Sequence, residues 1–190
     1  LLLFEAVHEY LQYTGDYKFI ENNIYDKLVI IIDNYSKKID IDDNNIYLDE
    51  DGLISSGTEN TQNTWMDAKY GNHCFTPRNG KAVEINALWY NATMIMAELC
   101  IKFGDKKEQK EYLRLAEECK RTFLEKFYNK KRNCLYDVLG DGRVRPNQLF
   151  ALSLCYPVVK PESDMAKSIL EVVEKKLLNR YGLKTLAKGE

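Results

Sequence analysis

One acidic residue of this chain has neighbours suited to acid catalysis on a sugar. Asp67 closes the run Thr64-Trp65-Met66-Asp67, and a general acid must be held near apolar surface, within hydrogen-bond reach of the bond it protonates. Trp65 and Met66 could supply that surface, and the Trp65 ring could also stack on a pyranose face. For Asp67 alone, an aspartate that ends a turn is the commoner explanation. The surrounding residues therefore decide between the two interpretations.

Polar and aromatic residues continue into the apolar segment that follows. Glu84 and Asn86 lie near the start of a segment that is otherwise too apolar to leave polar groups unpartnered. Sugar hydroxyls or water in a cavity could satisfy them, and an internal hydrogen-bond network explains them equally well. Like Trp65, Trp89 and Tyr90 could stack on sugar rings, although each of the three alone is better explained as part of a core.

Two further sets of polar residues could orient a sugar. Arg78 and Lys81 lie in a turn with Pro and Gly, and a plain surface turn is an equally good explanation. Arg145, Asn147 and Gln148 flank Pro146, which suits the first turn of a later helix. With Asp67 as the catalytic residue, the predicted substrate-binding residues are Trp65, Arg78, Lys81, Glu84, Asn86, Trp89, Tyr90, Asn147 and Gln148.

Other chemistries find little support. His8 and His73 are the only histidines, they are far apart, and no His-Glu-x-x-His run occurs, so no metal site is predicted. Gly140-Asp141-Gly142 matches neither common phosphate-loop pattern, and no Ser or Cys has the context of a nucleophile elbow. We expect no cofactor.

Composition narrows the partners and the compartment. The 27 basic and 29 acidic residues are interleaved, so neither nucleic acid nor an anionic membrane surface is an expected partner. No apolar run is long enough to span a bilayer. The five cysteines are odd in number and form no Cys-x-x-Cys pair, which favours reduced thiols. A soluble, cytoplasmic protein is expected.

Six helical segments are predicted, and they alternate in character. Apolar residues cover several or all sides of residues 2–12, 83–103 and 146–156, whereas residues 19–39, 108–127 and 165–178 each carry one apolar stripe. A helix that is apolar all round must be covered all round, and a helix with one stripe lies on the outside. No strand-like alternation interrupts this order. The pattern predicts an all-α fold of three αα-hairpins, each an inner helix followed by an outer helix.

A long connection separates the second and third helical segments. It spans residues 40–82 and contains the Asp67 run. An ordered loop of this length in a compact domain usually has a function, because its order must repay lost conformational entropy. We therefore predict that residues 40–82 form an active-site loop.

Four runs of this sequence resemble one enzyme family. In the family's order they are Thr64-Trp65-Met66-Asp67-Ala68-Lys69, residues 76–92 (Thr-Pro-Arg through Val-Glu-Ile-Asn-Ala-Leu-Trp-Tyr-Asn-Ala), Arg145-Pro146-Asn147-Gln148 through Leu154, and Tyr181-Gly182-Leu183-Lys184-Thr185-Leu186. Together they resemble the amylo-α-1,6-glucosidase domain of glycogen debranching enzymes. The first forty residues match only in helical character. Several ordered matches are much more specific than one short motif.

The resemblance implies a fold and a reaction. The fold would be an (α/α)6 toroid, and the reaction would hydrolyse the α-1,6-linked glucose at a branch point of glycogen or a limit dextrin. Asp67 would be the general acid, with inversion at the anomeric carbon. Inverting chemistry needs a second carboxylate about 6.5 to 9.5 Å away. The family places that base beyond a stretch rich in His, Gln, Gly and Trp, and no such stretch follows Leu186. Glu59 and Glu84 are the local candidates, and we assign both to positioning.

Three hairpins would make half of a six-hairpin ring. We therefore expect residues 1–190 to form part of a single glucosidase domain, with the remainder of that domain as a partner, and the isolated chain to be inactive. Another toroidal glycosidase is the nearer alternative. A non-catalytic helical-repeat scaffold is the more distant one, since the loop at 40–82 breaks the fixed period that a solenoid needs.

Overall fold

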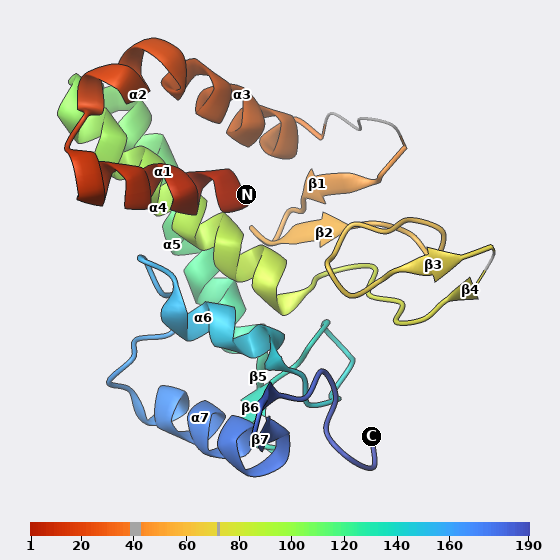
Figure 1. Ribbon diagram of the computed structural model, residues 1–190. Coiled ribbons are helices and arrows are strands. Elements are labelled where there is room, and N and C mark those ends of the chain that lie inside the picture. The colour runs from red at the N-terminus through yellow and green to blue at the C-terminus, as the bar shows by residue number, and fades with distance from the viewer. Residues whose placement is uncertain (39–42, 72) are drawn as a thin grey trace.

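The centre of the fold is a hairpin of two long helices. The computed structural model describes residues 1–38, 43–71 and 73–190, and α4 (Val83–Phe103) runs through the middle of it, followed by α5 (Lys106–Lys126) (Figure 1). Gly104 ends α4 in the left-handed conformation, and the Asp105 carboxylate caps α5 by accepting the N–H of Glu108. Helix α4 is buried on nearly all sides and α5 on one, as the sequence pattern predicts for this pair.

Shorter helices cover the rest of α4. Helix α1 (Leu2–Thr14), the 3₁₀ turn η1 (Pro146–Leu149) and α6 (Phe150–Ser153) contact α4, and α7 (Asp164–Leu177) contacts η1. Helix α1 buries one face through Phe4, Val7 and Leu11, while Leu2 is 61% exposed. The prediction that this first helix is covered on several sides is therefore wrong for the described residues.

Two of the predicted helices are interrupted or shortened. The helix expected at 19–39 is α2 (Tyr17–Asn23) followed by α3 (Tyr25–Ser36), with a break at Ile24, where φ is −120°. The Asn23 amide donates to the Phe19 carbonyl, a local bond that competes with continued helix. Residue 39 lies outside the described residues. The helix expected at 146–156 consists of η1 and the single turn α6, which ends at Ser153.

Short antiparallel two-stranded ribbons lie in the connections between the helices, although the sequence shows no strand-like alternation. Strands of two or three residues contain too few side chains to display an alternation. Helix nevertheless dominates, so the all-α class is confirmed. The paired strands are β1 (Ile46–Leu48) with β2 (Ile54–Ser56), β3 (Lys69–Tyr70) with β4 (His73–Cys74), β5 (Tyr128–Asn129) with β6 (Cys134–Leu135), and β7 (Leu178–Asn179) with β8 (Gly182–Leu183).

The predicted active-site loop carries β1 to β4 and lies at the end of the molecule where α1 and α4 begin (Figure 1). Residues 40–42 and 72 of that loop lie outside the described residues. One of its turns is anchored on α5, because Gly52 has φ 79° and a Cβ there would stand 2.6 Å from Glu118 Cγ. This turn and the ribbon β1–β2 are therefore packed against the helices.

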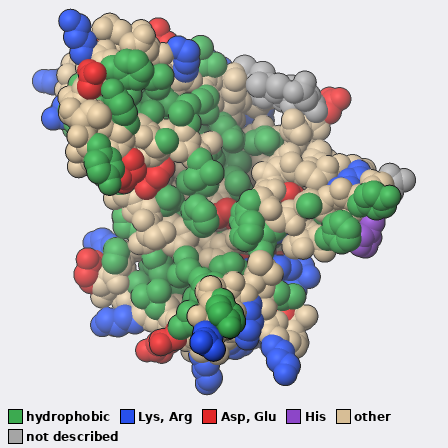
Figure 2. All heavy atoms as spheres, viewed as in Figure 1, with side chains coloured by type: hydrophobic (Ala, Val, Ile, Leu, Met, Phe, Trp, Pro, Cys, Tyr) green, Lys and Arg blue, Asp and Glu red, His purple; other side chains and the backbone are tan. Residues whose placement is uncertain are grey.

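Apolar side chains remain on the surface beside the helical core. Figure 2 shows them over the upper helices and across the middle of the visible face. All five cysteines are free, and Cys100, Cys119 and Cys134 are buried. In the part of the chain that the structure describes, no helix combines the length and apolar character needed to cross a membrane. The exposed apolar residues above 55% exposure are Leu2, Tyr13, Ile30, Trp65, Tyr70, Phe75, Ile101 and Tyr181.

Candidate active site

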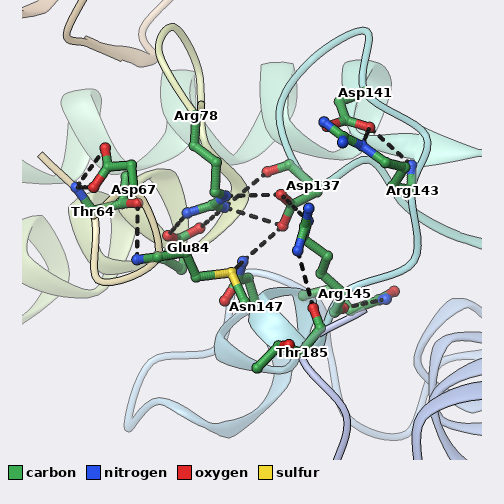
Figure 3. Close-up of polar contacts among 12 residues, drawn as sticks. Thr64, Asp67, Arg78, Glu84, Asp137, Asp141, Arg143, Arg145, Asn147 and Thr185 are labelled. Carbon is green, nitrogen blue, oxygen red and sulfur yellow. Dashed lines mark hydrogen bonds and ion pairs between the residues drawn. The ribbon is translucent and has the colours of Figure 1, made fainter. Parts of the chain in front are cut away.

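The carboxylate of Asp67 is buried inside its own turn. It is 3% exposed, and it accepts the backbone N–H of Asn63 at 3.0 Å and that of Thr64 at 3.0 and 3.2 Å. Figure 3 shows the carboxylate folded back toward Thr64. The sequence predicts apolar shielding by Trp65 and Met66, but Trp65 is 60% exposed and the bonds to the carboxylate come from backbone amides. The turn thus fixes the position of this acid through main-chain donors.

Trp65 is tied to the helical part of the chain by its indole nitrogen. Its Nε1 donates to Asn147 Oδ1 at 2.9 Å, which leaves much of the ring open to solvent. Asn147, at the start of η1, is 1% exposed, and its Nδ2 also contacts Met66 Sδ at 3.2 Å. The structure therefore brings together two residues predicted to bind substrate, although they are far apart in sequence.

Arg78 is the cation of a buried ionic cluster, not part of an exposed turn. Its Nη2 donates to Glu84 Oε2 at 2.6 Å, its Nη1 donates to Glu84 Oε1, and its Nε donates to Asp137 Oδ2 at 2.8 Å (Figure 3). Burial works to lower the pKa of Arg78, but the hydrogen bonds to Glu84 and Asp137 raise it above the usual arginine value. Its guanidinium is fully enclosed. In this structure Arg78 therefore holds neighbouring side chains in place and does not face solvent.

Asp137 and Arg145 complete this cluster, and sequence reasoning overlooked Asp137. It follows β6, is 2% exposed, and accepts from Asn147 Nδ2 at 2.7 Å. Arg145 Nε lies 3.4 Å from Asp137 Oδ2, yet it has no hydrogen-bond partner among the described residues. Burial lowers the pKa of Arg145, and the attraction of Asp137 does not cancel that shift. The sequence did contain one clue to Asp137. Arg78 and Arg145 lie beside apolar segments, and a buried arginine needs an acidic partner.

Lys81 has acidic partners within the long loop. Its Nζ lies 2.8 Å from carboxylate oxygens of both Asp49 and Asp51. Burial works to lower the pKa of Lys81, whereas these two ion pairs raise it. Asp51 also pairs with Lys126 of α5 at 2.7 Å. In this structure Lys81 therefore anchors the loop. These ion pairs account for the lysine without a contact to sugar.

Asn86 and Gln148 replace missing backbone partners. Asn86 Oδ1 accepts the Ile54 N–H at 2.7 Å and its Nδ2 donates to the Ile54 carbonyl at 3.1 Å, so its side chain pairs with β2 like a neighbouring strand. Gln148 Oε1 accepts the Leu135 N–H at 3.1 Å, and its Nε2 donates to the Arg145 carbonyl at 2.9 Å. Both amides are buried. The sequence left open whether such polar residues bind sugar hydroxyls or form an internal hydrogen-bond network. In this structure Asn86 and Gln148 belong to an internal network.

Trp89 and Tyr90 are core residues of α4. Trp89 is fully buried, with its ring centroid 5.7 Å from that of Tyr35, and Tyr90 is 7% exposed, with Lys120 Nζ 5.5 Å from its ring centroid. Neither ring presents a face to solvent that could stack on a sugar. The indole N–H of Trp89 has no partner among the described residues.

Trp89 offers a direct test of core packing against sugar stacking. We expect Trp89→Ala to lower the free energy of unfolding by about 3–5 kcal/mol, because it opens a large cavity. Trp89→Phe should cost much less, since it retains an aromatic ring and removes the unpartnered N–H. Urea unfolding of the full-length protein measures both. Unchanged stability together with weaker glucan binding in Trp89→Ala would restore the stacking role.

A cavity of about 280 Å³ lies beside the Asp67 turn. It opens where α1, α4 and α6 begin, and its lining combines aliphatic and aromatic residues with three polar residues of the loop and of α4. Such a lining suits a small molecule with an apolar face and several hydroxyls. The lining residues are Leu1, Leu2, Tyr35, Asn63, Thr64, Trp65, Glu84, Ile85, Leu88 and Phe150.

The two local candidates for a second carboxylate are placed differently. Glu59 is exposed in the loop. Glu84 reaches the cavity wall, but both of its oxygens accept from Arg78. A carboxylate bound in this way is poorly suited to take a proton from water. Glu84 therefore lacks the environment of a free general base.

Comparison with known proteins gives one family. A family model described as amylo-alpha-1,6-glucosidase matches residues 1–190, the whole chain. No curated protein matches the sequence.

Proposed function

Since the chain belongs to the amylo-alpha-1,6-glucosidase family, we propose that it serves to hydrolyse the α-1,6-linked glucose at branch points of glycogen or a limit dextrin. Membership makes it a glycosidase domain. The observation that carries the finer proposal is the buried carboxylate of Asp67, because Asn63, Thr64 and Trp65 of the same turn line the cavity. The acid and the cavity thus share one short segment.

Asp67 is the proposed general acid. It donates a proton to the glycosidic oxygen as the bond to the anomeric carbon breaks, and a water molecule adds to that carbon from the opposite face, which inverts its configuration. Glu59 and Glu84 are not proposed as the base that activates this water. We assign that role to a carboxylate of the remainder of the same glucosidase domain, which is the proposed partner of this chain.

Trp65 is the proposed sugar platform. Its ring is largely exposed and lines the cavity, and Asn147 fixes its indole nitrogen. The apolar face of a pyranose can lie on such a ring while its hydroxyls meet the polar lining residues Asn63 and Glu84. Arg78, Lys81, Asn86, Gln148, Trp89 and Tyr90 act in this proposal as supports of the site.

The proposal is tested by the choice of substrate. Full-length protein is incubated with a limit dextrin carrying single α-1,6-linked glucose residues, with maltose and with trehalose, and released glucose is followed by NMR. We expect glucose from the limit dextrin, with the β-anomer formed first. Maltose and trehalose should release little.

Two results would contradict the assignment of the substrate. Hydrolysis of maltose or trehalose without action on the limit dextrin would indicate another glycosidase reaction. Absence of binding to every saccharide would favour the scaffold interpretation. Formation of the α-anomer first would leave the substrate assignment intact and overturn the inverting mechanism.

A further inference from the structure

The turn that carries Asp67 is joined to the helical part through one buried side chain. Among the described contacts, the hydrogen bonds that Trp65 and Met66 make to the helical part both end on Asn147. Asn147 uses Oδ1 to accept the indole N–H and Nδ2 to donate to Asp137 Oδ1. An amide that is reversed would present a donor to the indole N–H, so the link exists in only one orientation of this amide.

Asp137 determines that orientation. As an ionised carboxylate it only accepts hydrogen bonds, and it faces Asn147 Nδ2 at 2.7 Å. Its oxygens also receive Arg78 Nε at 2.8 Å and Arg78 Nη2 at 3.1 Å, with Arg145 Nε at 3.4 Å. Both oxygens are thus held by fixed cations, and the carboxylate cannot turn away from Asn147.

The backbone of Asp137 is fixed as well. Its N–H donates to the Asp141 carbonyl at 3.0 Å, and its carbonyl accepts the N–H of Val83, the first residue of α4, at 3.0 Å. The side chain therefore projects from a site that is attached to the central helix. A rigid origin is what a residue needs if it is to position another residue accurately.

We propose that Asp137 is a positioning residue for the Asp67 turn and acts through the amide of Asn147. It holds Trp65 and Met66, which immediately precede the candidate acid, at a fixed distance from the start of α4. This role rests on the proposed function only for its catalytic consequence, because the link itself exists in the ligand-free protein.

Asp137→Asn is the variant that tests the link. Asparagine offers one acceptor oxygen, where aspartate offers two, to Arg78, Arg145 and Asn147. We expect the cations to take that oxygen, so the new amide faces Asn147 with a donor and the bond to Trp65 is lost. In ligand-free full-length protein, hydrogen exchange of the Asn63 and Thr64 amides should become about tenfold faster.

Activity gives an independent readout. A displaced turn should lower kcat for glucose release from the limit dextrin by about tenfold to a hundredfold. Asp141→Asn is the matched control, since it makes the same chemical change in the same turn and its carboxylate contacts Arg143 instead. It should leave both the exchange rates and kcat unchanged.

A double-mutant cycle separates positioning from general destabilisation. Trp65→Phe removes the indole N–H that Asn147 accepts while keeping an aromatic ring, so its effect on amide exchange should not add to that of Asp137→Asn. Asn147→Ala leaves Asp137 with its arginines and should reproduce the faster exchange, even if Asp137→Asn folds poorly. Unchanged exchange in Asn147→Ala, or additive effects in the cycle, would overturn the proposal. Faster exchange without any glucose release by the unsubstituted protein would uphold the link and reject the proposed function.

Discussion

Asp67→Asn is expected to lower kcat for glucose release from a limit dextrin by about a hundredfold to ten-thousandfold in the full-length protein, which is the usual contribution of a general acid. Asparagine cannot supply the proton that the departing glycosidic oxygen needs. Binding of the limit dextrin should change little, because Trp65 and the cavity walls remain. Steady-state kinetics and calorimetric binding measure the two quantities separately.

An activated substrate shows whether the lost function is proton donation. Fluoride leaves without protonation, so α-glucosyl fluoride should remain a substrate of Asp67→Asn if Asp67 is the acid. Loss of both activities would indicate instead that the substitution disrupts the turn, whose Asn63 and Thr64 amides need an acceptor. Glu50→Gln, an exposed change in the same loop, should retain full activity. Normal turnover of limit dextrin by Asp67→Asn would refute the assignment.

Arg78→Met should cost about 3–5 kcal/mol of unfolding free energy, because it leaves two carboxylates buried without their main cation. Glu84 and Asp137 are each 2% exposed, and Arg78 donates to both. Lysine should be a poor substitute, since one ammonium cannot reproduce the planar array of donors. Guanidinium unfolding of the full-length protein gives the difference in free energy.

Arg114→Met is the matched control for this cluster. Arg114 also contacts two glutamates, Glu111 and Glu118, but its side chain is 58% exposed on α5. Exposed ion pairs contribute about 0–1 kcal/mol. Equal losses in the two variants would mean that burial adds nothing to the Arg78 cluster. A triple change, Arg78→Met with Glu84→Gln and Asp137→Asn, should recover part of the stability by removing the unpaired charges.

Helix α4, which lies against neighbours on nearly all sides, was the easiest to predict. The bounds of α4 follow from its unbroken apolar character and from Gly104, which ends it. The break at Ile24 could not be found in this way, because the apolar spacing continues across it while Asn23 bonds locally to Phe19. The ribbon β1–β2 was missed because strands of three residues show no alternation, and Asn86, whose side chain bonds to Ile54, lies 32 positions away.

The sequence predicts a candidate site around Asp67, but it does not predict how the polar side chains of that site pair with one another. Asp67, Trp65 and Asn147 emerge from residue type and resemblance, and the structure places Trp65 and Asn147 in contact. Residue type cannot show which polar groups face a cavity and which satisfy one another. Arg78 illustrates this, because its partner Asp137 is 59 residues away and no local pattern joins them. The sequence offered one clue to this pair, since arginines within apolar segments need acidic partners.

The same separation along the chain bears on how the protein folds. Helices α4 and α5 meet through a short turn, so their contacts are local and can form early. Contact between Arg78 and Asp137 closes a loop of 59 residues. Burying either ion without its partner costs free energy, because the ion loses its hydration. The charges should therefore stay hydrated until the helices are in place. We therefore expect the region around Asp67 to become ordered late in folding and to open early in unfolding.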